Sequence, residues 1–123
     1  MDAYDELLER LKDIDIIGQI GGLVSWDQEV LMPPKAAALR AEQLSWISKT
    51  GHVRLTDPHI GKLLGKLESD DGLDDVQAAN VRLARESYDK ATKLPTEFVA
   101  EMAKHRSKAQ ISWTCLLYTS PRP

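Results

Sequence analysis

Residues 25–43 read SWDQEVLMPPKAAALRAEQ and contain a Trp-Asp pair, a glutamate, two consecutive prolines and an arginine. The residue before a proline is driven out of the α region, so we expect Pro33-Pro34 to end a helix. Pro34 in turn suits the first position of a following helix, where its missing N–H is not needed. The stretch therefore predicts a corner between two helices, with charged side chains that serve either chemistry or the shape of the corner.

The carboxylates of this stretch do not suit shared acid–base catalysis. Asp27 and Glu29 are two positions apart, and side chains so spaced on a helix point away from each other. Arg40 falls near the middle of the second helix's apolar face, where its aliphatic neighbours are Ala36, Ala37, Leu44 and Ile47. An unpaired charge on such a face is costly. We expect Arg40 to pair with Asp27 across the corner, with Trp26 packed beneath, so that these three residues form a structural corner.

The first predicted helix carries two apolar faces in succession. Both sets recur at helical spacing on nearly opposite sides: first Tyr4, Leu7, Leu8, Leu11 and Ile14, then Ile16, Ile17, Ile20, Leu23 and Val24. Glycine is a poor interior helix residue, and Gly18, Gly21 and Gly22 lie within the second set. Either the helix changes its packing partner near residues 13–15, or it kinks around these glycines.

Turn signals divide the rest of the chain into four further helices. The second should run from Pro34 to about Thr50, with Gly51 as its C-terminal stop. Asp57-Pro58 opens a short helix toward Glu68, and a polar turn precedes a fourth helix over about residues 73–92. Leu94-Pro95 separates this helix from a fifth. No segment alternates as a strand would, so the predicted fold is all-α, with about five helices in an antiparallel array.

The last two helices have predicted buried faces. In the fourth, the stripe comprises Leu73, Val76, Leu83, Ala84, Tyr88 and Ala91. In the fifth, it comprises Phe98, Met102, His105, Ala109 and Trp113. Asn80 lies within the fourth helix's stripe, and we expect it to form a hydrogen bond across the core.

Composition excludes several classes of partner. The net charge of −3 offers no basic stripe for nucleic acid. No apolar run approaches the roughly 18 residues of a membrane span, and the N-terminal residues lack the basic and apolar regions of a signal peptide. The single cysteine, Cys115, allows no internal disulfide. A cytoplasmic protein without a nucleic-acid or membrane partner is the simplest interpretation.

No motif for catalysis or metal binding occurs in the sequence. A helical zinc peptidase needs HExxH, which places two histidines one turn apart, and the sequence has no such motif. His52 and His59 are separated by Gly51 and Asp57-Pro58, while His105 falls on an apolar stripe where a core histidine is expected. There is also no GxSxG elbow and no phosphate-binding loop. We therefore assign no catalytic and no metal-binding residue within this chain.

The C-terminal residues differ in character from the rest. Residues 115–123, CLLYTSPRP, abandon the helical pattern and end in two prolines. The run CLLYTSP resembles the translation of a sequencing-library transposon adapter, and a natural extended tail is the alternative. We interpret residues 115–123 as a non-native tail and residues 1–114 as the native part, which would then stop in mid-helix.

Three runs, WDQEVLMPPKAAALRAEQ, NVRLARESYDKATKLPTEFVAE and SKAQISWT, are similar in order and spacing to the N-terminal segment of the carboxypeptidase Taq family. The resemblance implies a large all-helical peptidase, usually a homodimer, that removes C-terminal residues from peptides. It also implies a divalent metal, zinc or cobalt, held by an HExxH helix and a later glutamate. Those elements lie downstream in the family, so no ligand is carried over and this chain is expected to be an inactive N-terminal fragment without a cofactor of its own.

Two other classes of function stay open at this point. One is a self-standing helical module that binds a partner protein in a groove between its helices. The other is a helical regulatory or chaperone-like domain, for which helicity is the only support. A reading frame that continues past Thr114 to HExxH favours the peptidase, and a nearby native stop favours the module.

Overall fold

The fold is entirely helical over residues 1–119, the part of the chain that the computed structural model describes. It contains five α-helices: α1 (Ala3–Val30), α2 (Ala37–Leu55), α3 (Pro58–Glu68), α4 (Asp75–Thr92) and α5 (Thr96–Thr119). A single 3-10 turn, Pro34–Ala36, joins α1 to α2. These residues include no strand, which confirms the predicted all-α class. None of the helices they form is long and apolar enough to cross a membrane.

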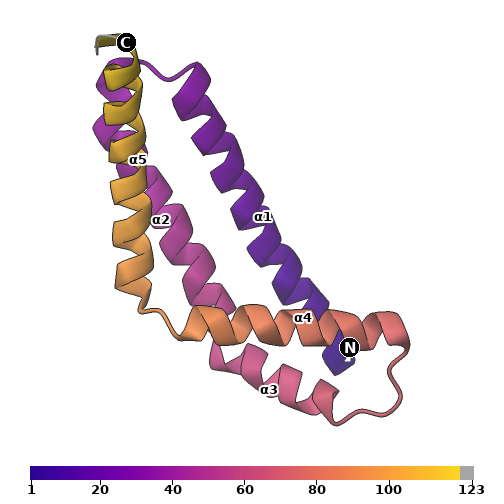
Figure 1. The fold of residues 1–123 in the computed structure, drawn as a ribbon. Helices are drawn as coiled ribbons and strands as arrows, with labels where there is room; N and C mark the ends of the chain where they lie inside the picture. Colours follow the sequence, from indigo (N-terminus) through magenta and orange to yellow (C-terminus); the bar gives the residue numbers. More distant parts are fainter. Residues whose placement is uncertain (120–123) are drawn as a thin grey trace.

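The helices form two groups that meet at one end of the molecule. α1, α2 and α5 run alongside one another with neighbours antiparallel, and α3 and α4 lie across their lower end (Figure 1). The predicted antiparallel array therefore describes α1, α2 and α5, while the α3–α4 pair departs from it. The N-terminus lies beside α4, and α5 ends near the corner between α1 and α2.

The main apolar core lies where the start of α1 meets α3 and α4. It contains seven buried side chains: Leu7, Ile60, Leu63, Leu64, Leu67, Val81 and Ala84. α3 contributes four of them because its leucines and isoleucine recur at helical spacing on one face. Asp57 caps α3 by accepting a hydrogen bond from the His59 amide at 2.9 Å, as predicted, and Pro58 occupies its first turn. α4 begins at Asp75 behind a capping box made by Asp74 and Gln77.

α1 is one helix and changes its packing partner along its length. Leu7, Leu11 and Ile14 pack against the α3–α4 core, whereas Ile17 and Gly21 face α2. Of the two alternatives drawn from the sequence, a change of partner or a kink at the glycines, the change of partner is confirmed, and the helix continues without interruption through Gly18, Gly21 and Gly22. Gly21 has a packing reason, since a Cβ there would lie only 3.2 Å from Cγ2 of Ile47.

α2 continues beyond its predicted end. Gly51 does not stop the helix, which runs on to Leu55. The additional turn contains His52, whose Nε2 donates to the Ala91 carbonyl oxygen and whose Nδ1 lies 2.8 Å from the Thr96 hydroxyl. These contacts to the last turn of α4 and the first residue of α5 stabilise the helical backbone after Gly51, which a glycine would otherwise weaken.

The predicted buried faces of α4 and α5 are partly wrong. On α4, Val76 and Leu83 are exposed, and the buried residues are Val81 and Ala84. On α5, the buried residues are Ala100 and Ser107, and four members of the predicted face are exposed, namely Phe98, His105, Ala109 and Trp113.

Close packing of α2 on α5 explains the second error. Buried Ala41 on α2 and buried Ala100 on α5 have small side chains, and the Ser45 hydroxyl of α2 donates to the Ala100 carbonyl oxygen at 2.9 Å. Small side chains allow two helix backbones to approach closely. A prediction based on large apolar residues therefore placed the buried face of α5 on the wrong side of the helix.

The structure also tests the predictions for Asn80 and for the C-terminal residues. Asn80 Nδ2 donates to the Tyr4 hydroxyl at 2.9 Å, but the bond lies at the surface and not across the core. The helical pattern was expected to end at Cys115, and α5 instead continues to Thr119. The remaining positions of the predicted tail, 120–123, lie outside the described residues.

Two glycines of α3 provide a matched test of this packing. A Cβ on Gly61 would lie 2.7 Å from the Tyr88 hydroxyl oxygen and 3.1 Å from its Cζ, whereas a Cβ on Gly65 meets nothing within 4 Å. Gly65→Ala should raise the free energy of unfolding by about 0.5–1 kcal/mol through helix propensity. Gly61→Ala should lower it, because Tyr88 must shift. Urea denaturation of both variants measures the difference, and equal stabilisation by the two would contradict the Gly61–Tyr88 contact.

Candidate functional site

The corner between α1 and α2 is organised by one arginine. Arg40 Nη2 lies 2.7 Å from Asp27 Oδ2, its Nη1 donates to the Val24 carbonyl oxygen at 3.0 Å, and its Nε donates to Gln43 Oε1 at 3.0 Å. The Arg40 side chain is 15% exposed. All three guanidinium nitrogens therefore have partners, as a largely buried charge requires.

Of the three residues assigned to the corner, the structure brings two together. Asp27 and Arg40 are in direct contact, whereas the Trp26 side chain is 55% exposed. Trp26 precedes Asp27 by one position, which turns it about 100° around the helix. The same corner has a second tie that sequence reasoning missed. Gln28 Nε2 donates to the Ser107 carbonyl oxygen at 2.9 Å, and the Ser107 hydroxyl donates back to Gln28 Oε1 at 3.0 Å.

An apolar groove lies beside the Asp27–Arg40 pair, between α1 and α2. Its volume is about 580 Å³, and its walls are Ile20, Leu23, Val24, Asp27, Arg40, Gln43, Trp46 and Ile47. The polar members of this lining are the corner residues, which already bind one another. The groove therefore offers apolar surface and no unsatisfied guanidinium for a charged ligand.

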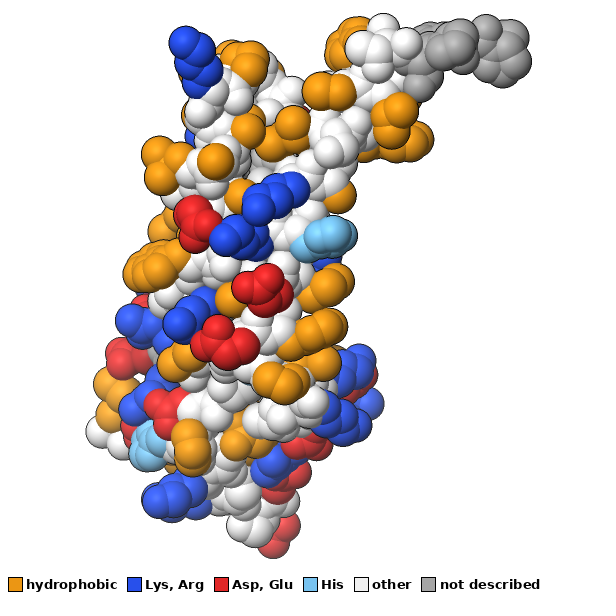
Figure 2. All heavy atoms as spheres, turned by 90° about the vertical axis from the view of Figure 1, so that its left-hand side faces the viewer, with side chains coloured by type: hydrophobic (Ala, Val, Ile, Leu, Met, Phe, Trp, Pro, Cys, Tyr) orange, Lys and Arg blue, Asp and Glu red, His pale blue; other side chains and the backbone are white. Residues whose placement is uncertain are grey.

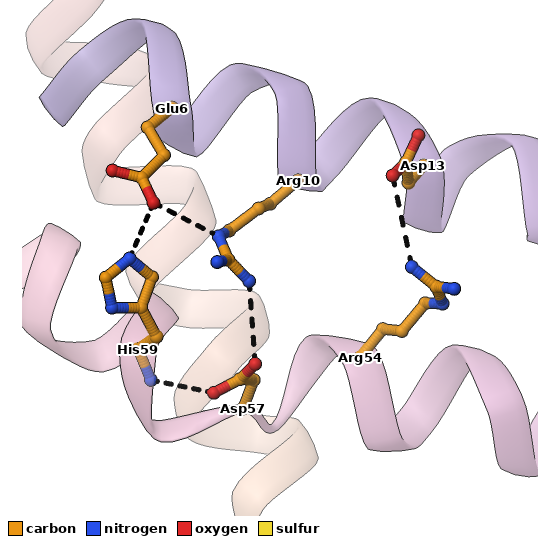
Figure 3. A network of polar contacts seen from close by, with 6 residues as sticks. All are labelled: Glu6, Arg10, Asp13, Arg54, Asp57 and His59. Carbon is orange, nitrogen blue, oxygen red and sulfur yellow. Dashed lines mark hydrogen bonds and ion pairs between the residues drawn. The ribbon is translucent and has the colours of Figure 1, made fainter. Parts of the chain in front are cut away.

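A second polar cluster joins the start of α1 to the α2–α3 junction (Figure 3). His59 Nε2 donates to Glu6 Oε1 at 2.6 Å, and Arg10 bridges Glu6 and Asp57 at 3.5 Å to each. The hydrogen bond from His59 lowers the pKa of Glu6, and the charge of Arg10 acts in the same direction. Because these side chains are each more than a third exposed, the cluster holds the helices together at the surface.

Two ion pairs link α2 to α5 on the outside of the molecule, and the longer one joins Lys49 Nζ to Glu97 Oε1 at 3.8 Å. Lys104 Nζ lies 2.6 Å from Glu42 Oε1. Its hydrogen bond lowers the pKa of Glu42, and the same contact raises the pKa of Lys104. The site therefore consists of ion pairs and an apolar groove on a helical scaffold, and its polar groups bind one another.

Comparison with known proteins identifies the family to which this helical chain belongs. Residues 6–115 match the family model of the carboxypeptidase Taq (M32) metallopeptidases. The chain belongs to this family. It is 36% identical over 115 residues to thermostable carboxypeptidase 1 of Thermus thermophilus, and 27% identical over 112 residues to thermostable carboxypeptidase 1 of Pyrococcus furiosus. These matches cover 90% and 91% of this chain but 22% of each relative.

The metal of an M32 metallopeptidase requires ligands that the described residues do not bring together. Among residues 1–119, no three or more His, Cys, Asp or Glu side chains form a group that could hold a metal ion. His52 and His59 lie on different helices and bind Ala91, Thr96 and Glu6. We therefore derive no catalytic step through a metal from these residues.

Replacement of Asp27 tests the corner. Asp27→Asn keeps the shape of the side chain and removes the charge that faces Arg40, so we expect the free energy of unfolding to fall by about 1–3 kcal/mol. Glu86→Gln is the matched control, because its partner Lys90 is an exposed neighbour on the same helix and should contribute far less. Thermal melting of both variants measures the effect. An Asp27→Asn protein that melts with the parent would show that the pair does not hold the corner.

The Glu6–His59 contact predicts a response to acid. A carboxyl whose folded-state pKa lies below its unfolded value of 4.5 stabilises the fold above that pH, and the stabilisation is lost as pH falls through the folded pKa. The melting temperature of the parent should therefore drop more steeply below pH 4.5 than that of Glu6→Gln. Glu9→Gln, at an exposed position of the same helix, is the control. Parallel pH profiles for parent and Glu6→Gln would contradict this assignment.

Proposed function

We propose that residues 1–114 are the N-terminal helical segment of a metal-dependent carboxypeptidase that hydrolyses C-terminal residues from peptides. The observation that carries the proposal is the match of residues 6–115 to the M32 family. Both relatives are carboxypeptidases by name, and the chain spans 22% of their length. Residues 115–123 stand outside the proposed native segment.

The chain by itself is proposed to be inactive. Metal-assisted peptide hydrolysis needs a bound cation to polarise the scissile carbonyl and to lower the pKa of a water molecule. The sequence contains no HExxH motif to hold such a cation. Zinc or cobalt as the metal, a homodimer and a cytoplasmic location are further parts of the proposal, and they rest on the family resemblance and on the presence of a single cysteine.

The geometry suits a scaffolding role for this segment. The α1–α2 hairpin is held by Arg40 at the corner, and α5 is tied to it through Gln28 and Ser107. These contacts fix three helices relative to one another without using an unpaired polar group. Such a unit supplies a rigid wall for chemistry that other parts of a larger peptidase perform.

A chimaeric enzyme tests the proposal. Residues 1–114 replace the matched segment of the Thermus thermophilus enzyme, and release of C-terminal amino acids from a peptide is measured with and without a chelator. We expect chelator-sensitive activity from the chimaera and none from the 123-residue chain alone. The control is the same enzyme with the matched segment deleted, which should be inactive. A folded chimaera without activity, or chelator-sensitive activity of the isolated chain, would overturn the proposal.

A further inference from the structure

α1 and α2 each expose a stripe of large apolar side chains at heptad spacing. On α1 the exposed members are Ile16, Ile20, Leu23 and Val30. On α2 they are Leu39, Trp46 and Val53, each seven positions from the next. Leu23 is 69% exposed and Trp46 is 66% exposed. A repeat of seven residues keeps side chains on one side of a helix, which is the arrangement that a partner helix packs against.

Three members of these two stripes line the apolar groove between α1 and α2. Ile20 and Leu23 line it from α1, and Trp46 lines it from α2. Figure 2 shows hydrophobic side chains gathered along both edges of the face formed by α2 and α5, with charged side chains between them. The groove is thus an apolar strip lined by residues 20–27 and 40–47.

α5 does not cover this strip, because it packs on a different side of the same hairpin. Its contacts use Gln28 of α1 and Ser45 of α2, which point about 100° or more away from the groove-lining Leu23 and Trp46 by helical geometry. The α1–α2 hairpin therefore has one side covered by a helix and another side bare. Contiguous exposed apolar surface of this kind marks a protein contact.

The residues that line the groove indicate what kind of ligand it binds. Asp27, Arg40 and Gln43 at one end are already paired, so they do not call for a charged ligand. The walls are largely apolar and come from two adjacent helices, over about two turns of each, which suits an amphipathic helix. The relatives extend over more than four times the matched length, since the match covers 22% of each. Such a length is ample to supply a helix that covers the strip.

We propose that the groove between α1 and α2 docks an amphipathic α-helix from the remainder of the metallocarboxypeptidase polypeptide. The docked helix places apolar side chains between Leu23 and Trp46 and makes the hairpin part of a continuous helical core. This inference rests on the proposed function, because it takes the missing cover from the same enzyme.

Cysteine labelling in the chimaeric enzyme tests the proposal. Cys115 lies outside the transplanted residues, and in the isolated chain it is replaced by Cys115→Ser. Leu23→Cys reports on the groove, and Lys66→Cys, an exposed position on α3, is the matched control. Reaction with a maleimide is followed for both variants in the isolated chain and in the chimaera. We expect Leu23→Cys to react as fast as Lys66→Cys in the isolated chain and at least tenfold more slowly in the chimaera.

The possible outcomes separate this inference from the proposed function. An active chimaera in which Leu23→Cys still reacts as fast as the control would overturn the docking and leave the peptidase assignment intact. Slow labelling in the isolated chain, relieved by dilution, would show that a second copy occupies the groove and would also overturn it. A folded but inactive chimaera counts against the proposed function, whatever its labelling rate.

Discussion

The structure depends on α1 remaining one unbroken helix. Its 28 residues span about 42 Å at the usual rise per residue. Over that length the helix first packs against α3 and α4 and then against α2. The relative placement of the two helical groups follows from this shared element. Glu6 and Arg10 reinforce the arrangement, because they tie the first turns of α1 to the α2–α3 junction through His59 and Asp57.

The corner after α1 sets which surfaces are covered and which are bare. Two prolines end the helix, and Arg40 then holds α2 against α1 through Asp27 and the Val24 carbonyl oxygen. With the hairpin fixed in this way, α5 packs on one side through small residues, and the apolar groove lies on another. Asp27, one of the two carboxylates that looked like candidate acids in the sequence, is therefore structural, and with Arg40 it lines one end of the groove.

Local signals in the sequence were sufficient to locate the five helices and the Arg40–Asp27 contact, although α2 and α5 continue beyond their predicted ends. Prolines, caps and a charge on an apolar face act over a few residues, so their consequences can be derived without the fold. The buried face of α5 could not be derived this way. Ala100 and Ser107 are buried because α5 packs closely on α2, and no pattern of apolar residues in the sequence indicates that contact. Likewise, Gln28 and Ser107 are 79 positions apart, and neither carries a signal that it needs the other. Family membership came from the order and spacing of three sequence runs, and the match over residues 6–115 confirms it.

Native-state amide hydrogen exchange along α1 tests the central claim, that one continuous helix joins the two groups. The account predicts that amides of residues 14–24 exchange slowly and together with those of residues 7–13, because the helix passes through Gly18, Gly21 and Gly22 without a break. Fast exchange confined to these glycines and their neighbours, with slow exchange on both sides, would contradict it. That pattern would mean that α1 is two helices joined by a hinge, and that the corner and the α3–α4 core are positioned independently.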